Sequence, residues 1–577
     1  MQGGLGAVSG AGVTLYEAGT AYGASATSLG SATTDSNGNF TVGYTPLSSP
    51  TVLYLLALGG NAGAGNNVAI GLMGVAGLSN ALPASVTINE LTTVAAQQAL
   101  AQFIDSTGQT IGAPSSNATG LANAINQVQA NLANISTGLP ASFLSCTSGS
   151  NCDGLERLDT IANILAACVE SSGPDATLPS CAAASTPCDV LFACSSTPSS
   201  GTALEAAHVM ATSPTANVNT LFALQSGSSP FTPALSAAPD GWEIALNFAP
   251  SGLSDPQGVA IDAAGNVWVT NLGGNSVTEL TSSGGLAGNF NNSNTPGANF
   301  NAPYGVAIDA AGNVWVTNRN GNSVTELTSS GTLAGNFAPS GASFNVPQGV
   351  AIDAAGNVWV TNYNGNSVTE LTSSGGLAGN FAPSGANFND PHGVAIDAAG
   401  NVWVTNQGGN SVIALTPPAG LGPILSFGNN GFNITFFSGP LGVAIDAAGD
   451  AWVTNGGSVI EIPYPGNVFP LNFAPSGANF NAPYGVAIDA AGNVWVTNYN
   501  GNSVTELTSS GTLAGNFAPS GASFNVPQGV AIDAAGNVWV TNYNGNSVTE
   551  LIGAARLVLT PLVACLTQSP PAAVCLP

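Results

Sequence analysis

One short motif, GVAIDAAGNVWVTN, returns at nearly regular intervals through the second half of the chain. Seven copies are present, the first at residues 258–271, and one copy carries two changes. Successive copies are 43 to 49 residues apart, as measured between their aspartates: Asp262, Asp309, Asp353, Asp397, Asp446, Asp489 and Asp533. A period in the forties that consists of short strands is typical of the blades of a β-propeller.

Each typical copy predicts four strands, in the order GVAID, NVWVT, SVTEL and an LAGNF-like segment. The small residues of GVAID suit an innermost strand, and DAAG places Asp and Gly at positions i and i+3 of a type I turn. In the second strand, Trp268 points away from Val267 and Val269, and we expect this large ring to fill the wedge between adjacent sheets. Asn-Gly pairs such as Asn320-Gly321 predict hairpins with positive φ at these residues.

The pattern P-x-G-V-A-I-D-A-A-G-N-V-W-V-T-N resembles the NHL-repeat family and, more loosely, the propeller of virginiamycin B lyases. It covers Pro256 to Leu551, and seven copies imply seven blades. The last copy ends at SVTEL without an LAGNF-like sequel, whereas WEIALNFA at residues 242–249 precedes the first copy. Because an unpaired terminal blade would leave an exposed edge, we predict that Glu243–Phe248 forms the outer strand of the seventh blade.

With 577 residues, the chain is too long for one core. We predict a mainly β protein with five segments: a small β-sandwich over 1–88, a helical region with a cysteine cluster over 89–226, a linker over 227–240, a seven-bladed NHL-like propeller over 241–555 and a tail over 556–577. In the first segment, SGAGVTLYEAG followed by ATTDSNGNFTV resembles the carboxypeptidase-regulatory-like or prealbumin-like sandwich of bacterial exported proteins. This resemblance implies a small accessory module without catalytic residues.

The pattern of apolar residues supports these first two segments. Strands are predicted at Val13–Tyr16, Asn39–Tyr44, Thr51–Leu58, Val68–Leu72 and Ser85–Ile88. From about residue 89 the period changes to that of a helix, and helices are predicted at Leu91–Ile104, Ala203–Ala211 and Ala216–Leu224 and around Leu121–Leu132 and Leu155–Val169. We interpret the apolar side chains that recur at helical spacing, and His208 among them, as structural.

Fixed positive charge is almost absent from the chain. It contains no Lys, three Arg residues (Arg157, Arg319 and Arg556) and 29 Asp and Glu residues, which gives a net charge of −26. Nucleic acid is therefore excluded as a partner, because phosphate binding needs clustered Lys and Arg, and an anionic membrane surface is disfavoured for the same reason. No run of eighteen apolar residues predicts a transmembrane segment.

The eight cysteines indicate an oxidising compartment. Cys146 lies close to Cys152 and Cys565 close to Cys575, while Cys168, Cys181, Cys188 and Cys194 form a cluster. Their even number and the lack of zinc-binding spacing favour disulfides, although the pairing stays open and reduced thiols remain an alternative. We expect a secreted or cell-envelope protein. Because Met1–Gly12 has no signal-like pattern, we expect the export signal to lie upstream or to have been removed.

Two positions that flank the motif vary between copies. One precedes the first Gly (Gln257, Tyr304, Gln348, His392, Leu441, Tyr484 and Gln528), and the other follows the last Asn (Leu272, Arg319, Tyr363, Gln407, Gly456, Tyr499 and Tyr543). Both loops open on the same end of a propeller. We therefore predict a face rich in Tyr and Gln that binds a neutral polar ligand, namely a glycan, peptide or protein. Neutral drift on exposed loops is the alternative.

The fourth and fifth copies depart from the pattern. The connection Pro417–Pro440 is unusually long, the loop at Asn455–Ser458 has lost two residues, and Asp450 replaces Asn in the turn. This sector is a candidate for a specialised surface. In contrast, residues 297–371 match residues 477–551, with Arg319 becoming Tyr499 as the single change.

Catalysis finds little support in the sequence. The seven turn aspartates could gather Ca²⁺ or Mg²⁺, but they lack the D-x-D spacing of a calcium loop, so we interpret them as turn caps. The resemblance to virginiamycin B lyases implies several histidines, an acid and a divalent metal, whereas the propeller repeats contain only His392. We assign no catalytic residue, metal or cofactor and expect a monomeric binding or scaffold protein. The alternative is a lyase or hydrolase that uses the central channel of the propeller.

Overall fold

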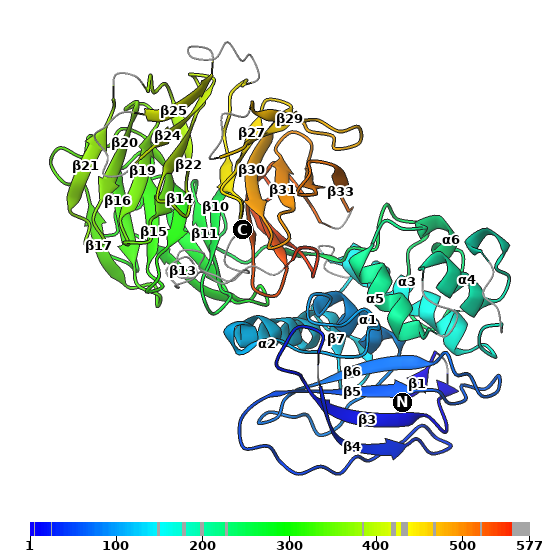
Figure 1. Ribbon diagram of the computed structural model, residues 1–577. Helices are drawn as coiled ribbons and strands as arrows, with labels where there is room; N and C mark the ends of the chain where they lie inside the picture. Colours follow the sequence, from blue (N-terminus) through cyan, green and yellow to red (C-terminus); the bar gives the residue numbers. More distant parts are fainter. Residues whose placement is uncertain are drawn as a thin grey trace.

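The computed structural model describes residues 1–4, 6–24, 26–146, 151–175, 180–196, 201–225, 229–383, 386–416, 423–428, 437–464, 469–519 and 522–556. An N-terminal sheet with its helices lies beside a ring of sheets (Figure 1). Most of the long connection at 417–440 and the tail with Cys565 and Cys575 lie outside the described residues.

The N-terminal region contains one antiparallel sheet in the order β4-β3-β5-β6. Its strands are β3 (Gly12–Glu17), β4 (Thr27–Thr33), β5 (Val52–Leu58) and β6 (Gly71–Leu78), and the short β1 (Gln2–Gly3) and β2 (Gly6–Ala7) pair with each other. The predicted sandwich is not confirmed, because helices pack against β6. The strands predicted at Asn39–Tyr44 and Ser85–Ile88 are wrong: both segments are irregular. Asp35 accepts the backbone N–H groups of Asn37 and Asn39, and this turn interrupts the extended chain just before the first of the two segments.

Six α-helices follow in the described part of this region: α1 (Glu90–Ala99), α2 (Ala118–Gln127), α3 (Cys152–Val169), α4 (Pro187–Cys194), α5 (Ala203–Thr212) and α6 (Val218–Phe222). Shorter elements between them are η1 (Ser115–Asn117), η2 (Val128–Leu132), β7 (Ala133–Asn134), β8 (Leu139–Pro140) and η3 (Cys181–Ala183). A capping box of Asn89 and Thr92 starts α1. The predicted disulfides are present as Cys146–Cys152, Cys168–Cys188 and Cys181–Cys194. None of the described helices is long and apolar enough to cross a membrane.

The repeats form four-stranded antiparallel sheets, with each strand hydrogen-bonded to the next. In chain order, the first sheet contains β10 (Pro256–Ile261), β11 (Val267–Asn271), β12 (Ser276–Leu280) and β13 (Leu286–Asn291), the second β14 (Pro303–Ile308), β15 (Val314–Asn318), β16 (Ser323–Leu327) and β17 (Leu333–Phe337), and the third β18 (Pro347–Ile352), β19 (Val358–Asn362), β20 (Ser367–Leu371) and β21 (Leu377–Phe381). The fourth sheet contains β22 (Pro391–Ile396), β23 (Val402–Asn406), β24 (Ser411–Leu415) and β25 (Pro423–Gly428), and the fifth β26 (Val443–Ile445), β27 (Ala451–Asn455), β28 (Ser458–Ile462) and β29 (Leu471–Phe473). The sixth sheet contains β30 (Pro483–Ile488), β31 (Val494–Asn498), β32 (Ser503–Leu507) and β33 (Leu513–Phe517), and the last sheet contains β34 (Pro527–Ile532), β35 (Val538–Asn542) and β36 (Ser547–Leu551) with β9 (Ala245–Phe248).

The last of these sheets joins the two ends of the repeat region. β9 pairs with β36, so that Phe248 lies opposite Val548 and Ala245 opposite Leu551. The prediction of this outer strand is confirmed for Ala245–Phe248, whereas Glu243 and Ile244 precede the strand. The inner strands of successive sheets are neighbours, and β34 is in turn a neighbour of β10. The sheets therefore close into a propeller around a central channel.

The tryptophan of each repeat fills the wedge between sheets, as predicted. Trp268 is fully buried and packs against Val314 and Val316 of the next sheet. It also stacks on Phe290 of its own sheet, with ring centroids 5.5 Å apart.

A threonine in every second strand ties each sheet to the next one. Thr270 accepts the backbone N–H of Gly258 and donates its hydroxyl to the carbonyl of Tyr304 in the following sheet. The same donation recurs from Thr317, Thr361, Thr405, Thr454, Thr497 and Thr541, the last of which returns to the carbonyl of Gln257. Glycine is required at position 258 because a Cβ there would lie 2.7 Å from the carbonyl oxygen of Tyr304.

The hairpins between second and third strands differ from the prediction in one respect. Positive φ occurs at the asparagine after the Asn-Gly pair, for example 50° at Asn322, and not at Asn320 or Gly321. The N–H of Gly321 bonds the carbonyl of Asn318. Because Asn318 pairs with Ser323, the hairpin loop contains four residues rather than two. The side chain of Asn322 then accepts the N–H of Val346 from the next sheet.

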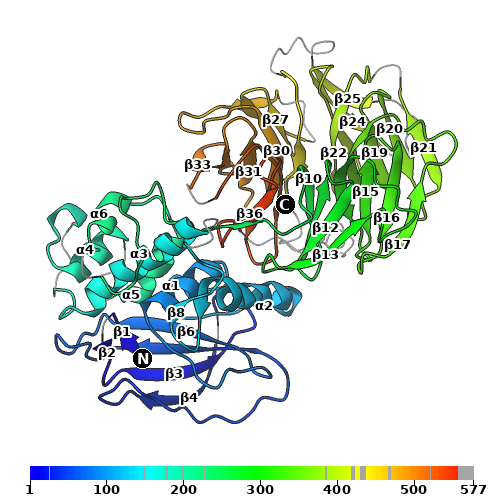
Figure 2. The same ribbon diagram turned by 180° about the vertical axis from the view of Figure 1, so that it is seen from behind.

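The N-terminal helices dock on the end of the ring that carries the Asp turns. Side chains of α2 and the turn before it bond to the last and first sheets: Asn117 and Asn123 donate to the carbonyls of Ala534 and Ala264, and Gln127 donates to Glu550. Figure 2 shows α1 and α2 between the N-terminal sheet and the propeller. One hydrophobic core runs through both parts of the molecule.

Candidate functional site

The residues that precede the repeat glycine converge on the axis of the propeller. The hydroxyl groups of Tyr304 and Tyr484 contact each other, and His392 Nε2 lies 3.2 Å and 3.3 Å from them. These side chains come from β14, β30 and β22, which belong to the second, sixth and fourth sheets. Together they close the central channel at the end opposite the Asp turns.

Residues that follow the second strand lie against this cluster. The guanidinium carbon of Arg319 is 5.8 Å from the centroid of the Tyr304 ring, and Tyr499 stacks on Tyr484 with centroids 5.8 Å apart. A cation over an aromatic face and an offset ring pair are both favourable arrangements. Both sets of variable residues therefore meet on one end of the ring, as the sequence predicts.

The three glutamines of the inner ring are buried, and two of them are incompletely bonded. Gln257, Gln348 and Gln528 are only 5%, 3% and 4% exposed. Among the described residues, Oε1 of Gln348, Oε1 of Gln528 and Nε of Arg319 have no hydrogen-bond partner. Leaving such a group unsatisfied costs about 1 to 3 kcal/mol, and a buried polar atom without a partner therefore needs an explanation.

The remaining predicted residues lie further out. Tyr363, Gln407 and Tyr543 are half-buried. Burial raises the pKa of Tyr363 and of Tyr543, and the charge of Arg319 opposes this effect at both. The backbone N–H of Gln407 bonds the carbonyl of Asp390. Hereafter the Tyr/Gln face means Gln257, Tyr304, Arg319, Gln348, Tyr363, His392, Gln407, Tyr484, Tyr499, Gln528 and Tyr543.

Burial keeps the centre of the Tyr/Gln face uncharged. It raises the pKa of Tyr304 and takes that of Tyr484 well above its ordinary value. It also lowers the pKa of His392 to about 4. At neutral pH the two phenols and the imidazole are therefore neutral, and Arg319 supplies the positive charge. Such a surface suits a neutral ligand that offers hydrogen bonds.

The turn aspartates at the other end have a structural role. Asp309 accepts the backbone N–H groups of Ala311 and Asn313 through Oδ1, and the side chains of Asn313 and Trp315 donate to Oδ2. Local donors thus occupy both carboxylate oxygens, which agrees with their interpretation as turn caps.

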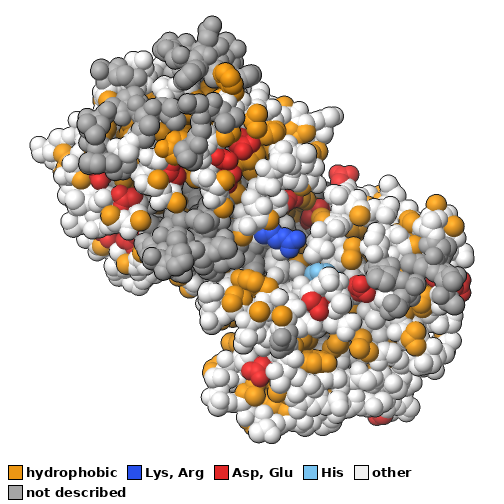
Figure 3. All heavy atoms as spheres, in the orientation of Figure 1, with side chains coloured by type: hydrophobic (Ala, Val, Ile, Leu, Met, Phe, Trp, Pro, Cys, Tyr) orange, Lys and Arg blue, Asp and Glu red, His pale blue; other side chains and the backbone are white. Residues whose placement is uncertain are grey.

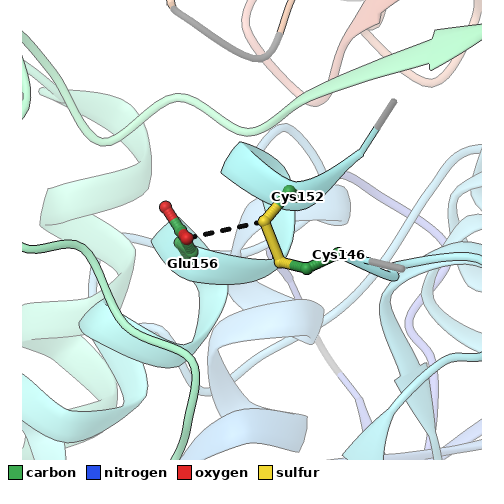
Figure 4. Close-up of side chains that lie close together, drawn as sticks. All are labelled: Cys146, Cys152 and Glu156. Carbon is green, nitrogen blue, oxygen red and sulfur yellow. Dashed lines mark hydrogen bonds between the residues drawn. A yellow bond between two sulfur atoms is a disulfide. The ribbon is translucent and has the colours of Figure 1, made fainter. Parts of the chain in front are cut away.

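Possible metal ligands gather elsewhere in the described part of the chain. One group of three contains Cys146, Cys152 and Glu156, but the two sulfur atoms form a disulfide and Glu156 only lies beside it (Figure 4). The other group contains Asp446, Asp450 and Glu461 on the fifth sheet. Of the residues that make up the Tyr/Gln face, only His392 is a His, Cys, Asp or Glu, and Arg319 brings a positive charge to the face. These residues do not fit the divalent metal that the lyase resemblance implies.

The channel between the two ends of the ring contains a cavity of about 720 Å³. The Val-Ala-Ile residues of the inner strands line it, together with turn residues of the fourth and fifth sheets and Tyr464. The sequence predicted the small inner strand. It did not predict the cavity, because the width of the channel depends on closure of the whole ring.

Charged side chains are sparse on the face of the molecule that Figure 3 shows. On the face of the molecule in Figure 3, Lys and Arg side chains form one small group, and acidic side chains are scattered over both parts. No basic stripe is present on this face to follow a phosphate backbone.

Comparison with known proteins supports the propeller. The profile of the Virginiamycin B lyase family matches residues 241–422. A streptogramin B lyase structure is 20% identical, covers 54% of this chain and 97% of its own, and has a TM-score of 0.45. A catalytically inactive virginiamycin B lyase from Staphylococcus aureus, solved with quinupristin, is 19% identical over 53% of this chain and 98% of its own, with a TM-score of 0.46.

A third similar structure is the extracellular domain of a hybrid two component system from B. thetaiotaomicron. It is 13% identical, covers 54% of this chain and 43% of its own, and has a TM-score of 0.44. None of the curated proteins compared with the chain is similar to it in sequence. The family match over residues 241–422 and the repeated four-stranded sheets together support a propeller protein.

Proposed function

We propose that this is an extracellular or envelope-associated binding protein, which holds a neutral polar ligand on the Tyr/Gln face of a seven-bladed propeller. The ligand is a glycan, a peptide or a segment of another protein. The unpartnered Oε1 atoms of Gln348 and Gln528 carry the proposal, because they lie in the ring of residues that contains Tyr304, His392 and Tyr484. The three disulfides support an oxidising, extracytoplasmic setting.

The chemistry of this face selects for hydrogen-bond donors on the ligand. The two amide oxygens accept hydroxyl or N–H groups, while Arg319 donates to a ligand oxygen. The exposed faces of Tyr499 and its neighbours suit the apolar side of a sugar ring or a peptide side chain. Both oxygens are buried in the free protein, so the glutamine side chains must turn towards the ligand for these hydrogen bonds to form. A ligand without donors gains nothing from this change.

A glycan and peptide binding screen on the full chain tests the proposal, and the Gln348→Leu variant sharpens it. The substitution removes an unsatisfied acceptor, so the free protein should keep its stability. Affinity for the ligand should fall about 5- to 10-fold, as expected for one lost hydrogen bond. Gln2→Leu, at an exposed site in the N-terminal region, is the control. No binder in the screen, or equal affinity of Gln348→Leu and wild type, would contradict the proposal.

Arg319→Tyr is a second test, because the duplicated copy already has Tyr499 at the equivalent position. The variant makes the two copies identical and removes the single cation of the face. We expect weaker binding of the ligand, and we expect this loss to disappear for ligands that lack an acceptor near Arg319.

A streptogramin lyase-like activity is the alternative, favoured by the family match to residues 241–422. It would need His392, whose pKa is lowered to about 4 by burial, far from the value that suits a general base at neutral pH. Incubation with quinupristin, followed by chromatography, tests it directly. Turnover by the wild-type chain that His392→Ala abolishes would establish the lyase and replace the binding proposal.

A further inference from the structure

The channel cavity has the size and the walls of a small-molecule site. Its volume of about 720 Å³ lies within the range of roughly 300 to 1,000 Å³ that is usual for ligand pockets. Apolar residues from every inner strand line it, such as Val306, Ala307 and Ile308 in the second sheet. Val306 and Ala307 are only half-buried, so apolar surface remains accessible inside a concave space.

The cavity is closed at one end and extends to the other. Tyr304, His392 and Tyr484 meet on the axis just before the wall residues of the same strands. At the end of the ring with the Asp turns, only the fourth and fifth sheets contribute turn residues to the described lining of the cavity. These residues are Asp397–Ala399 and Asp446–Gly449, and Tyr464 also lines the cavity. The cavity therefore reaches the Asp-turn end between the fourth and fifth sheets, away from the docked helices on the last and first sheets.

This opening between the fourth and fifth sheets is the mouth of the cavity, and the fifth repeat differs there from the others in its charged residues. In the fourth sheet, Asn401 donates its side-chain N–H to Asp397. In the fifth sheet, Asp450 replaces that asparagine and instead accepts the backbone N–H of Tyr464 at 2.6 Å. Asp446, Asp450 and Glu461 consequently bring carboxylate oxygens within 4.8 Å of one another. Asp446 lines the cavity mouth, and Asp450 and Glu461 lie next to Asp446 outside the lining. The fifth repeat therefore has more acidic groups near this turn than any other repeat.

We propose that the channel binds an elongated amphiphile with a cationic head group, such as a long-chain amine or quaternary ammonium. The apolar tail lies along the Val-Ala-Ile walls, where its apolar surface is removed from water. The head group lies at the mouth beside Asp446 and Asp450. The net charge of −26 attracts cations to the molecule over longer distances. This site is separate from the Tyr/Gln face and does not depend on what that face binds.

Isothermal titration of the full chain with dodecyltrimethylammonium, below its micelle concentration, tests the proposal. We expect one saturable site and at least about 10-fold weaker binding of dodecyl sulfate, which has the same tail and the opposite charge. Asp450→Asn restores the residue of the other repeats and should lower the affinity for the cation about 5-fold. Glu17→Gln removes one negative charge from the N-terminal sheet and should have no effect.

A second variant tests whether the ligand binds in the channel. Ala351→Phe adds a ring in the middle of the wall, and a folded Ala351→Phe protein should not bind the probe. If that substitution prevents folding, Asp450→Asn and the comparison of the two head groups still decide the question. Absence of saturable binding by the wild-type chain, equal binding of both detergents, or unchanged affinity in Asp450→Asn would each overturn the proposal.

Discussion

Residues 297–371 and 477–551 are two copies of one sequence that differ only at Arg319 and Tyr499, yet they have different surroundings. In the first copy, Ala355 is exposed and Glu370 is half-buried. In the second copy, the equivalent Ala535 and Glu550 are 1% and 0% exposed, because α2 and the chain after β36 cover them. The repeat alone builds the sheet, and the non-repeated residues decide which sheets become an interface.

The largest effect should come from breaking this interface. A Cβ on Gly120 of α2 would lie 2.1 Å from the carbonyl oxygen of Ala534, so Gly120→Leu must move the helix away from the last sheet. We expect a loss of about 3 kcal/mol in the free energy of unfolding, measured by urea denaturation. Asn126→Leu, on the exposed side of the same helix, should be nearly neutral.

Hydrogen exchange can locate that effect. In Gly120→Leu, amides of β36 should exchange faster than in the wild type, whereas the identical β20 should be unchanged. Peptides that extend beyond residues 551 and 371 distinguish the two copies by mass, since the sequences diverge there. Equal changes in both strands would mean that the helix does not stabilise the last sheet selectively.

The second prediction concerns pH. Burial raises the pKa of Glu550 well above its ordinary value of 4.5, and the neighbouring Asp533 adds to this effect. The folded state therefore holds this proton more tightly than the unfolded state. Its contribution to stability is complete below about pH 4.5 and is lost as the pH rises through the folded pKa.

Glu550→Gln keeps the hydrogen-bonding shape of the side chain and removes the titration. At about pH 8 the variant should be more stable than the wild type by about 2 kcal/mol, and its stability should decline less between about pH 5 and 8. Glu370→Gln, the same substitution in the exposed copy, should change stability by less than about 0.5 kcal/mol. Parallel pH profiles for the two variants would contradict this difference.

These contrasts show which parts of the structure can be predicted from the sequence. The repeat period, the Asp turn, the wedge tryptophan and the closing strand near Phe248 all depend on local patterns, and each was predicted. Thr270 was not assigned its role, because its hydroxyl bonds to a different sheet 34 residues later. In the N-terminal sheet, Thr27–Thr33 was missed as a strand because its small residues have weak β propensity.

The site shows the same limit. Comparison of the copies predicted which residues share the Tyr/Gln face, since equivalent positions in a ring lie on one end. The contact of Tyr304 with Tyr484 across the axis joins residues 180 positions apart, and it depends on the radius of the closed ring. The acidic group beside the mouth likewise needed the structure, because Glu461 lies on β28, eleven residues after Asp450 in the turn before β27.

The smallest effect in the comparison should come from the tryptophans. Trp315 Nε1 donates to Asp309 Oδ2 at 3.1 Å. In the second copy, Asp489 Oδ2 accepts the backbone N–H of Arg556, and Trp495 Nε1 has no partner among the described residues. Both rings are fully buried and stack on a phenylalanine at similar distances, 5.5 Å and 5.3 Å. Replacement by Phe therefore removes a similar packing contribution from each copy but a hydrogen bond from the first copy alone.

Trp315→Phe should thus cost about 1 kcal/mol more than Trp495→Phe in urea denaturation. The two variants control for each other, because the neighbouring residues in the repeat are the same. Equal losses would mean that the indole N–H of Trp495 has found a partner, and a larger loss for Trp495→Phe would show that the docked copy is packed more tightly than the exposed one. Either result would contradict the inference that Arg556 deprives Trp495 of its hydrogen bond to Asp489.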